Sequence, residues 1–459
     1  MPRISVGLFG AALLAAVAVA CGDDDPSGPP SPVFNNLAAE AVAENGLAAQ
    51  AVVRASGYDS VRVRALLAAG DEAVVSPAAV FEGDSIARVD ILGLHLETAY
   101  RIVADLWDGG TLETAPDTAD FATGVRPAWI PVVTAVGTDT LPGLVLLSLP
   151  DGAAIVDNQA RLVWYRPHPT NQLTSFTAHA DGSYTLAATI GTGGEILSLD
   201  RAGREVGRLV CANGRPTRFH DLLIEADGTR WLLCDETRVM DLSGLGGNAA
   251  AQVLGTVVQG VSSSGTLLFE WNSFDHFAIT DLPAADRMGP NVNFTHGNGV
   301  AFDSEGKLLL SFRSLSEVTS VDTATGAVLW RLGGLANQFT FQNDPKGHFD
   351  RQHGVRPAGP SQLQLLDNGL AAPSRMARYL VNPTTLTATM VWEFIDAPGT
   401  FTFVGGSTQS VPVEGRALVS FGQAGRVVEV DAAGNRAWEL QGLEGMYVFR
   451  AQRIAGLYR

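Results

Sequence analysis

Three histidines in the second half of the chain are spaced as if they shared one site. His220, His296 and His353 lie eight, ten and six residues before a turn glycine, respectively, and all three offsets are even. Even offsets keep side chains on one face of an extended strand. We therefore predict that the three imidazoles begin the inner strands of three different sheets, near one mouth of a common axis.

Clustered imidazoles favour two kinds of chemistry. A neutral imidazole is nucleophilic near pH 7, because its pKa is about 6.5, and it also carries protons. Clustered histidines also bind divalent metals. A metal site would lack an obvious fourth, carboxylate ligand on the same inner ring, but both interpretations stay open at this point.

Arg313 adds a cation to this set. The strands of Arg313 and His296 meet at a turn near Ser304 and Glu305, and the two residues lie about equally far from it. They should therefore be neighbours across a hairpin. In two other repeats of the chain the position of Arg313 holds Gly and Thr. A long cation in place of a small residue indicates an anion site, and a structural ion pair is the alternative interpretation.

The remaining histidines carry weaker signals. His276 follows the end of a repeat, and we expect it to help line the mouth. His179 lies only three residues before its turn glycine and is excluded. His95 lies in a predicted sandwich, and His168 and His348 lie on predicted loops.

The elements that must position these side chains are repeats. Residues 306–322 read GKLLLSFRSLSEVTSVD, and residues 415–431 read GRALVSFGQAGRVVEVD. Both continue through a glycine turn into a strand that ends near a tryptophan. We count six copies of this plan, which cover residues 143–165, 182–200, 228–271, 306–330, 363–392 and 415–438. Radial repetition of short sheets is typical of a β-propeller, so we predict an all-β protein with a six-bladed propeller over residues 143–459.

The first copy lacks its inner strand. We predict that the C-terminal segment, residues 447–458, supplies it and closes the ring. Closure removes two unpaired sheet edges. A stacked solenoid is the competing architecture, and it would not need the end of the chain to return to its start.

A small sandwich precedes the repeats. Residues 33–126 alternate apolar and polar residues, and Leu94–Tyr100 resembles the tyrosine corner of fibronectin type III-like domains, in which a tyrosine hydroxyl returns to the backbone. We expect a fibronectin type III-like sandwich here, followed by a linker at residues 127–142.

The N-terminus carries a processing signal. Residues 1–20 read as a secretory signal, and Ala18-Val-Ala-Cys21 resembles the bacterial lipobox, in which the cysteine is lipidated. An ordinary signal peptide with an incidental cysteine is the alternative. Residues 21–32 form a Pro-rich tether. We expect a lipid-anchored protein of the bacterial cell envelope, on the periplasmic face or in the outer membrane, with the anchor as its only membrane contact.

Composition and cysteine usage narrow the function classes. The 459 residues include 31 Lys plus Arg against 48 Asp plus Glu, a formal charge of −17, and only two of the cations are lysines. A nucleic-acid binder is therefore not expected. Cys211 and Cys234 are either a disulfide, which an oxidising compartment permits, or two buried thiols. There is no Walker phosphate loop, dinucleotide fingerprint, Gly-x-Ser-x-Gly, His-Glu-x-x-His or Cys-x-x-Cys.

A series of motifs carries a family resemblance. Residues 325–334 read TGAVLWRLGG, and Gln352-His353, Leu365–Gly369 (LLDNG) and Ser374-Arg375 follow. The series closely resembles the bacterial arylsulfate sulfotransferases. His220-Asp221, Phe274-Asp-His276, His296-Gly-Asn298 and Ser311-Phe-Arg313 resemble further motifs of that family in the same order. The resemblance covers about residues 143–459.

The resemblance implies a periplasmic six-bladed propeller that moves a sulfuryl group from a phenolic sulfate donor to a phenol acceptor. It implies no nucleotide donor, and we expect no cofactor or metal. His353 is the implied nucleophile and becomes sulfated. The implied partners that hold the sulfuryl oxygens and assist proton transfer are His220, His296 and Arg313, and the implied substrate-binding residues are His276 and Asn298.

Two departures from the family pattern affect these roles. Gly354 stands where the family usually has Asp, and Gly299 stands where Ser is common. They would either loosen the orientation of the histidines or mark a branch with a different substrate. Two other functions remain as alternatives, namely a metal-dependent propeller lyase or hydrolase and a non-catalytic propeller that binds a ligand.

Overall fold

A computed structural model describes residues 31–83, 85–137, 141–168, 174–190, 193–397, 399–411 and 415–458. Strands and short 3-10 turns make up the regular structure of these residues, which confirms the all-β prediction. None of their helical turns is long and apolar enough to cross a membrane. The predicted signal segment and Cys21 lie outside the described residues.

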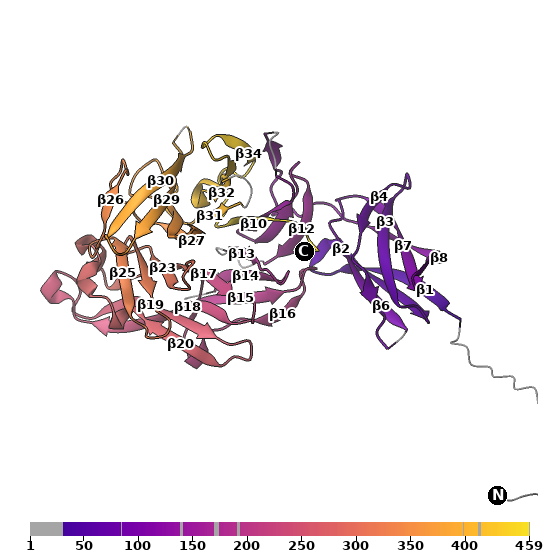
Figure 1. Cartoon of the computed structure of the whole chain (residues 1–459), viewed down its shortest axis with the longest axis horizontal. Coiled ribbons are helices and arrows are strands. Elements are labelled where there is room, and N and C mark those ends of the chain that lie inside the picture. The colour runs from indigo at the N-terminus through magenta and orange to yellow at the C-terminus, as the bar shows by residue number, and fades with distance from the viewer. Residues whose placement is uncertain are drawn as a thin grey trace, which may run out of the picture.

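The N-terminal part is a sandwich of two sheets (Figure 1). One sheet pairs β1 (Val33–Val42), β2 (Asn45–Ser56) and β6 (Ile86–Leu92). The other has the order β4 (Glu72–Val75), β3 (Ser60–Leu67), β7 (Ala99–Asp108) and β8 (Thr111–Ala122), with β5 (Ala79–Val80) also paired to β3. Alternating residues of both sheets form one apolar core, as a half-buried strand pattern requires.

The predicted tyrosine corner is present. The buried hydroxyl of Tyr100, at the start of β7, accepts a hydrogen bond from the backbone N–H of His95 at 2.8 Å. This bond ties the connection before β7 to the edge of the sandwich.

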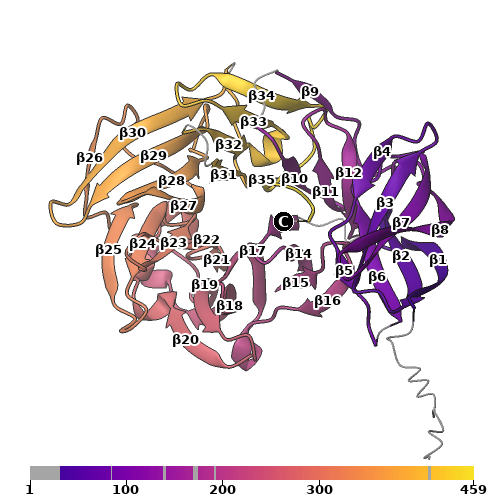
Figure 2. The same ribbon diagram turned by 45° about the vertical axis from the view of Figure 1, so that its right-hand side comes forward.

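Six sheets follow, and Figure 2 shows them around a common centre. Their strands, from the innermost strand outward, are β35 (Ala451–Ile454), β10 (Leu144–Leu149), β11 (Gly152–Val156) and β12 (Leu162–Pro167); β13 (Thr174–Ala178), β14 (Tyr184–Ile190), β15 (Gly193–Leu199) and β16 (Glu205–Arg208); β17 (Thr217–Ile224), β18 (Arg230–Met240), β19 (Ala251–Val261) and β20 (Leu267–Asn272); β22 (Gly297–Phe302), β23 (Leu308–Phe312), β24 (Glu317–Val321) and β25 (Val328–Gly333); β27 (His353–Gly359), β28 (Gln362–Asp367), β29 (Arg375–Asn382) and β30 (Thr387–Ile395); and β31 (Ser407–Ser410), β32 (Ala417–Ser420), β33 (Val427–Val430) and β34 (Arg436–Gln441). The arrangement is propeller-like.

The inner strands form a closed cycle. In chain order β13, β17, β22, β27, β31 and β35 each contact the next, and β35 contacts β13. The strand β35 pairs antiparallel with β10, with Leu144 opposite Ile454. The C-terminal segment therefore supplies the inner strand of the first sheet, as predicted, and no sheet edge is left open at the junction. A solenoid does not have this pairing.

Three short strands extend the sheets in ways that the repeat pattern did not predict. Within the expected linker, β9 (Thr134–Val136) pairs with β34. Two others, β21 (Asn291–Asn293) and β26 (Thr340–Gln342), add parallel strands to β19 and β30. Each has three residues, too few to show an alternating pattern, so only the neighbouring edge determines them.

The sandwich packs against the first sheets of the ring, beside β12 (Figure 1). Val42 and Leu92 of the sandwich share an apolar cluster with Trp164 of β12. The hydroxyl of Tyr458, near the C-terminus, accepts from the N–H of Leu92 at 2.7 Å. The segment that closes the ring therefore also holds the sandwich in place.

Candidate active site

His353 is held by its Nδ1 atom. It is the first residue of β27, and Nδ1 lies 2.7 Å from Oδ1 of Asn368, the residue that follows β28. The Asn368 amide is itself oriented, because its Nδ2 donates to the carbonyls of Thr402 and Gly405 at 2.8 and 3.0 Å. Its oxygen must therefore face the imidazole.

This contact determines the tautomer of His353. An amide oxygen only accepts hydrogen bonds, so Nδ1 of His353 carries the proton and Nε2 carries the lone pair. Nε2 accepts a hydrogen bond of 3.2 Å from the N–H of Gly405. Of the two ring nitrogens, Nε2 is the one that can attack an electrophile.

His220 and His296 meet directly. Their Nε2 atoms are 3.0 Å apart, and the rings meet edge to face. Nδ2 of Asn293 donates to Nδ1 of His296 at 2.6 Å, so Nε2 of His296 is a donor and Nε2 of His220 is an acceptor. The remaining proton of His220 is on Nδ1, a buried atom with no hydrogen-bond partner among the described residues.

Phe449 links this pair to His353. Its ring lies 5.9 Å from that of His220 and 6.2 Å from that of His353, measured between centroids. It precedes β35, the strand that closes the ring. His220 and His353 thus contact the same aromatic side chain of the C-terminal segment, and His296 contacts His220.

Arg313 is a buried cation without a directly paired carboxylate among the described residues. Its backbone N–H donates to the carbonyl of His296 at 3.1 Å, which confirms that the two residues are neighbours across a hairpin. Its guanidinium lies over the ring of Phe403 at 4.8 Å, and Nη2 donates to the Phe403 carbonyl at 3.1 Å. In the described part of the chain Asp286 acts on the charge of Arg313 without a direct ion pair, and the buried Nε of Arg313 has no partner. The alternative of a direct structural ion pair is therefore not observed among these residues.

Burial keeps the three imidazoles uncharged. It lowers the pKa of His353 to about 4, and the Arg313 cation acts in the same direction. Burial also places the pKa values of His220 and His296 well below the usual range, and His353 and Arg313 contribute to the shift of both. The site is therefore a set of neutral imidazoles beside one unpaired positive charge, which suits an anion.

A search against family models matches residues 194–443 to the arylsulfotransferase (ASST) family. The chain belongs to this family. The matched segment includes the three histidines and Arg313, and the sequence resemblance is confirmed.

Solved structures similar to this arylsulfotransferase share little sequence with it. They include a protein of unknown function from Bacteroides caccae (13% identity, 68% of this chain and 99% of that chain, TM-score 0.46) and virginiamycin B lyase from Staphylococcus aureus (10%, 68% and 99%, TM-score 0.35). Kuenenia stuttgartiensis hydrazine synthase is a third (12%, 72% and 93%, TM-score 0.39). No curated protein sequence matches the chain.

The family departures at Gly354 and Gly299 have structural reasons in this arylsulfotransferase. Gly354 has a φ of 60°, a left-handed conformation that glycine adopts without strain. At Gly299 a Cβ would come within 2.9 Å of the backbone nitrogen of Val355, so a serine does not fit there. The backbone of β22 approaches β27 closely at this point. Both glycines therefore allow the backbone conformation that places His353 at the start of β27.

Asn298 acts on the backbone before His353 in the described structure. Its Nδ2 donates to the carbonyl of Gln352 at 2.7 Å, while its buried Oδ1 has no partner among the described residues. Gln352 is fixed in turn by Nε2, which donates to the Ser311 hydroxyl at 3.0 Å and to the Glu317 carbonyl at 2.9 Å. These contacts fix the backbone that leads into His353.

Two predicted residues differ in placement. His220 is the fourth residue of β17 and does not begin it, because the pairing with β18 shifts register between Thr217 and Leu222. His276 is exposed and stacks on Trp271 at 4.7 Å, and in the described part of the chain no hydrogen bond or ring contact joins it to the other histidines. A disulfide joins Cys211 to Cys234.

Sequence reasoning missed the residues that orient the site in the described structure. Asn368 was visible only as part of a motif, and nothing in the sequence distinguished Phe403, Gly405 or Phe449. As for a metal, no group of three or more His, Cys, Asp or Glu residues that could hold one occurs within the described ranges.

Proposed function

We propose that this arylsulfotransferase moves a sulfuryl group from a phenolic sulfate ester to a phenol through a sulfohistidine on His353. We infer that the six sheets are the blades of a six-bladed propeller and that the N-terminal sandwich is a fibronectin type III-like domain. One observation carries the catalytic proposal. The bond from Nδ1 of His353 to Asn368 leaves the Nε2 lone pair directed at the 402–406 segment, on which the unpaired Arg313 also rests.

The first half-reaction forms one bond and breaks one. The N–H of Gly405 releases Nε2 of His353, Nε2 gives its lone pair to sulfur, and the bond between sulfur and the aryl oxygen breaks. The electron pair leaves with the phenolate, which takes a proton from the His220–His296 pair. The anionic ester raises the pKa of these imidazoles when it binds, so the proton enters with the donor. Asn368 holds the Nδ1 proton throughout.

The second half-reaction reverses these steps. The oxygen of the acceptor phenol attacks sulfur, its proton returns to the same imidazole pair, and the N–S bond breaks to restore neutral His353. A phenol, with a pKa of about 10, leaves far more readily than an alkyl alcohol. We therefore expect both the donor ester and the product ester to be aryl sulfates.

The donors around the site stabilise the charge that develops on the sulfuryl oxygens. Nε of Arg313 and Nδ1 of His220 are both buried and unpartnered among the described residues, so each can donate to an oxygen without first breaking another bond. Hydrogen bonds from such donors to a charged group contribute about 1.5–3 kcal/mol each.

The test uses 4-nitrophenyl sulfate as donor and phenol as acceptor. Without acceptor, the peptide that contains His353 should gain the mass of one sulfuryl group, and phenol should remove it. His353→Ala should abolish both the labelling and nitrophenol release, whereas the control His348→Ala, an exposed histidine on a neighbouring loop, should retain both. Turnover that survives His353→Ala, or label on another residue, would refute the assignment.

We also propose that the mature protein is anchored to the cell envelope through a lipid on Cys21. The small-residue segment before Cys21 and the Pro-rich tether after it support this location, and the Cys211–Cys234 disulfide suits an oxidising compartment. Metabolic labelling with an alkyne fatty acid should tag the wild-type protein and not Cys21→Ala. Equal labelling of the two would contradict the anchor.

A further inference from the structure

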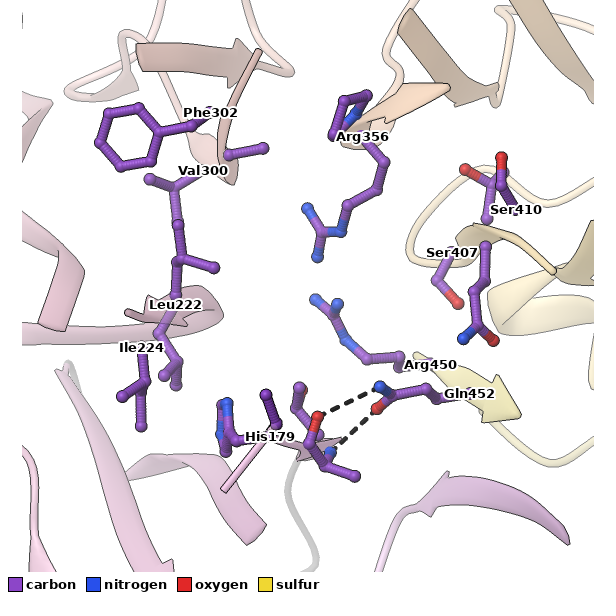
Figure 3. A pocket seen from close by; sticks show the side chains of 18 of the residues that line it. His179, Leu222, Ile224, Val300, Phe302, Arg356, Ser407, Ser410, Arg450 and Gln452 are labelled. Carbon is purple, nitrogen blue, oxygen red and sulfur yellow. Dashed lines mark hydrogen bonds between the residues drawn. The ribbon is translucent and has the colours of Figure 1, made fainter. Parts of the chain in front are cut away.

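The centre of the ring holds a cavity toward the end opposite the histidines. The cavity has a volume of about 510 Å³, and all six inner strands contribute to it (Figure 3). The histidines lie at or near the beginnings of β17, β22 and β27, whereas the cavity is lined by residues such as Ile224 and Phe302, with which β17 and β22 end. The two sites therefore occupy different ends of the same axis.

The walls of this cavity differ in polarity. Leu222, Ile224, Val300 and Phe302 form an apolar wall, and Ser407 and Ser410 lie on the opposite side in Figure 3. Between them the guanidinium groups of Arg356 and Arg450 extend toward the same region. An apolar wall with a few converging polar groups is the usual construction of a small-molecule site.

The two arginines share one carboxylate. Arg356 donates to both oxygens of Asp221 at 2.8 Å, and Arg450 donates to one of them at 2.8 Å. Among the described residues that line the cavity there is no Asp or Glu. Burial lowers the pKa of His179, the remaining titratable lining residue, to about 4, so it is neutral at pH 7. Two cations against one anion leave one positive charge here, in a chain whose formal charge is −17.

Arg356 has hydrogen-bonding capacity to spare. In the described part of the chain its bonds to Asp221 and to the carbonyl of Val355 use three of the five guanidinium N–H groups. Its side chain is 25% exposed, whereas that of Arg450 is 8% exposed and is also bonded to Ser175 and the His220 carbonyl. A ligand can therefore reach Arg356 without displacing Asp221.

We propose that this cavity is a second, non-catalytic ligand site for an aromatic monoanion such as an aryl sulfonate or aryl carboxylate. Its anionic group accepts hydrogen bonds from the free N–H groups of Arg356, and its ring lies against Leu222 and Val300. A fork of two N–H donors matches the paired oxygens of these groups. A volume of about 510 Å³ is large enough for a compound of one or two rings.

The test is calorimetric titration of the full-length protein with naphthalene-2-sulfonate at low ionic strength. The carbon–sulfur bond of this probe makes it unsuitable as a sulfuryl donor, so only binding is measured. Ile224→Glu places a carboxylate in the cavity, and Ile224→Gln is its uncharged match. We expect the Glu variant to bind the probe about tenfold or more weakly than the Gln variant, and the neutral naphthalene-2-sulfonamide to bind both alike.

A second set of variants separates this cavity from the histidine site. Binding to the cavity should persist in Arg313→Met, which removes the cation at the other end of the channel. If the Ile224 variants fail to fold, Ser410→Asp and Ser410→Asn form an equivalent pair. Equal affinity within both matched pairs, or loss of all binding in Arg313→Met, would overturn the proposal. Because the measurement needs no turnover, a protein without sulfotransferase activity leaves this test intact.

Discussion

Replacement of Arg313 by methionine distinguishes a catalytic cation from a structural one. One Nη2 hydrogen bond of Arg313 goes to the Phe403 carbonyl, and the partnerless Nε and the remaining N–H groups are available for a sulfuryl oxygen. Hydrogen bonds to charged groups contribute about 1.5–3 kcal/mol each, so the loss of two costs about 3–6 kcal/mol. We expect kcat/KM for 4-nitrophenyl sulfate to fall roughly 10²- to 10⁴-fold.

The same substitution should not destabilise the fold. Burial lowers the pKa of Arg313 to about 10, so keeping it charged costs the folded protein about 3 kcal/mol. Methionine removes that cost, whereas the loss of the hydrogen bond to the Phe403 carbonyl destabilises the folded protein by about 1 kcal/mol. The free energy of unfolding of Arg313→Met should therefore equal or exceed that of the wild type. Activity and stability move in opposite directions at functional sites of this kind.

Arg375 provides the contrasting control. Its buried guanidinium is paired with Asp344, Asp367 and Glu393 at 2.8–3.0 Å. Removal of one partner from a buried ion network typically costs about 3–5 kcal/mol, so Arg375→Met should unfold at much lower urea concentration. The assays are nitrophenol release and urea unfolding followed by tryptophan fluorescence. If Arg313→Met loses as much stability as Arg375→Met, or keeps the wild-type kcat/KM, the catalytic reading of Arg313 is refuted.

Two further predictions concern His353 and its support, and a third concerns the disulfide. Because burial lowers the pKa of His353 to about 4, kcat/KM should fall in acid with a midpoint near pH 4. A pH–rate profile with a midpoint near 6.5 would contradict this environment of His353. Asn368→Ala should lower kcat by roughly 10²- to 10⁴-fold with little change in KM, as expected when a histidine loses the group that fixes its tautomer, and an unchanged kcat in steady-state kinetics would show that the contact is dispensable. Replacement of both Cys211 and Cys234 by serine removes a disulfide between residues 23 apart in sequence. It should lower the free energy of unfolding in urea titrations by about 3 kcal/mol. Identical unfolding curves of the wild type with and without reductant would argue against the disulfide.

Several features of this protein followed from local sequence patterns. The period-two alternation and the recurring turn glycines predicted an all-β chain of repeated sheets, and the missing inner strand of the first copy predicted the pairing of β35 with β10. The tyrosine corner at Tyr100 and the contact of Arg313 with His296 were also predictable. Each of these features depends on the spacing of residues within one hairpin or on the inner strand that the first repeat lacks.

The orientation of the site was not accessible from spacing. Which imidazole nitrogen of His353 carries the proton depends on Asn368, and the orientation of Asn368 depends on carbonyls of the 402–406 segment, which precedes β31. His220 and His296 are in direct contact, and the pairing of β17 around His220 shifts register, an irregularity that side-chain spacing does not predict.

The sequence by itself determined the class of fold, the order of the repeats and the residue types available for sulfuryl transfer, because these depend on periods of a few residues. Only the tertiary structure decided that Arg313 has no direct ion pair in the described part of the chain, and that Arg356 and Arg450 share Asp221 beside the central cavity. Such pairings join residues from different sheets. The distances between such residues depend on how the sheets are arranged around the ring, and a local sequence pattern does not specify that arrangement.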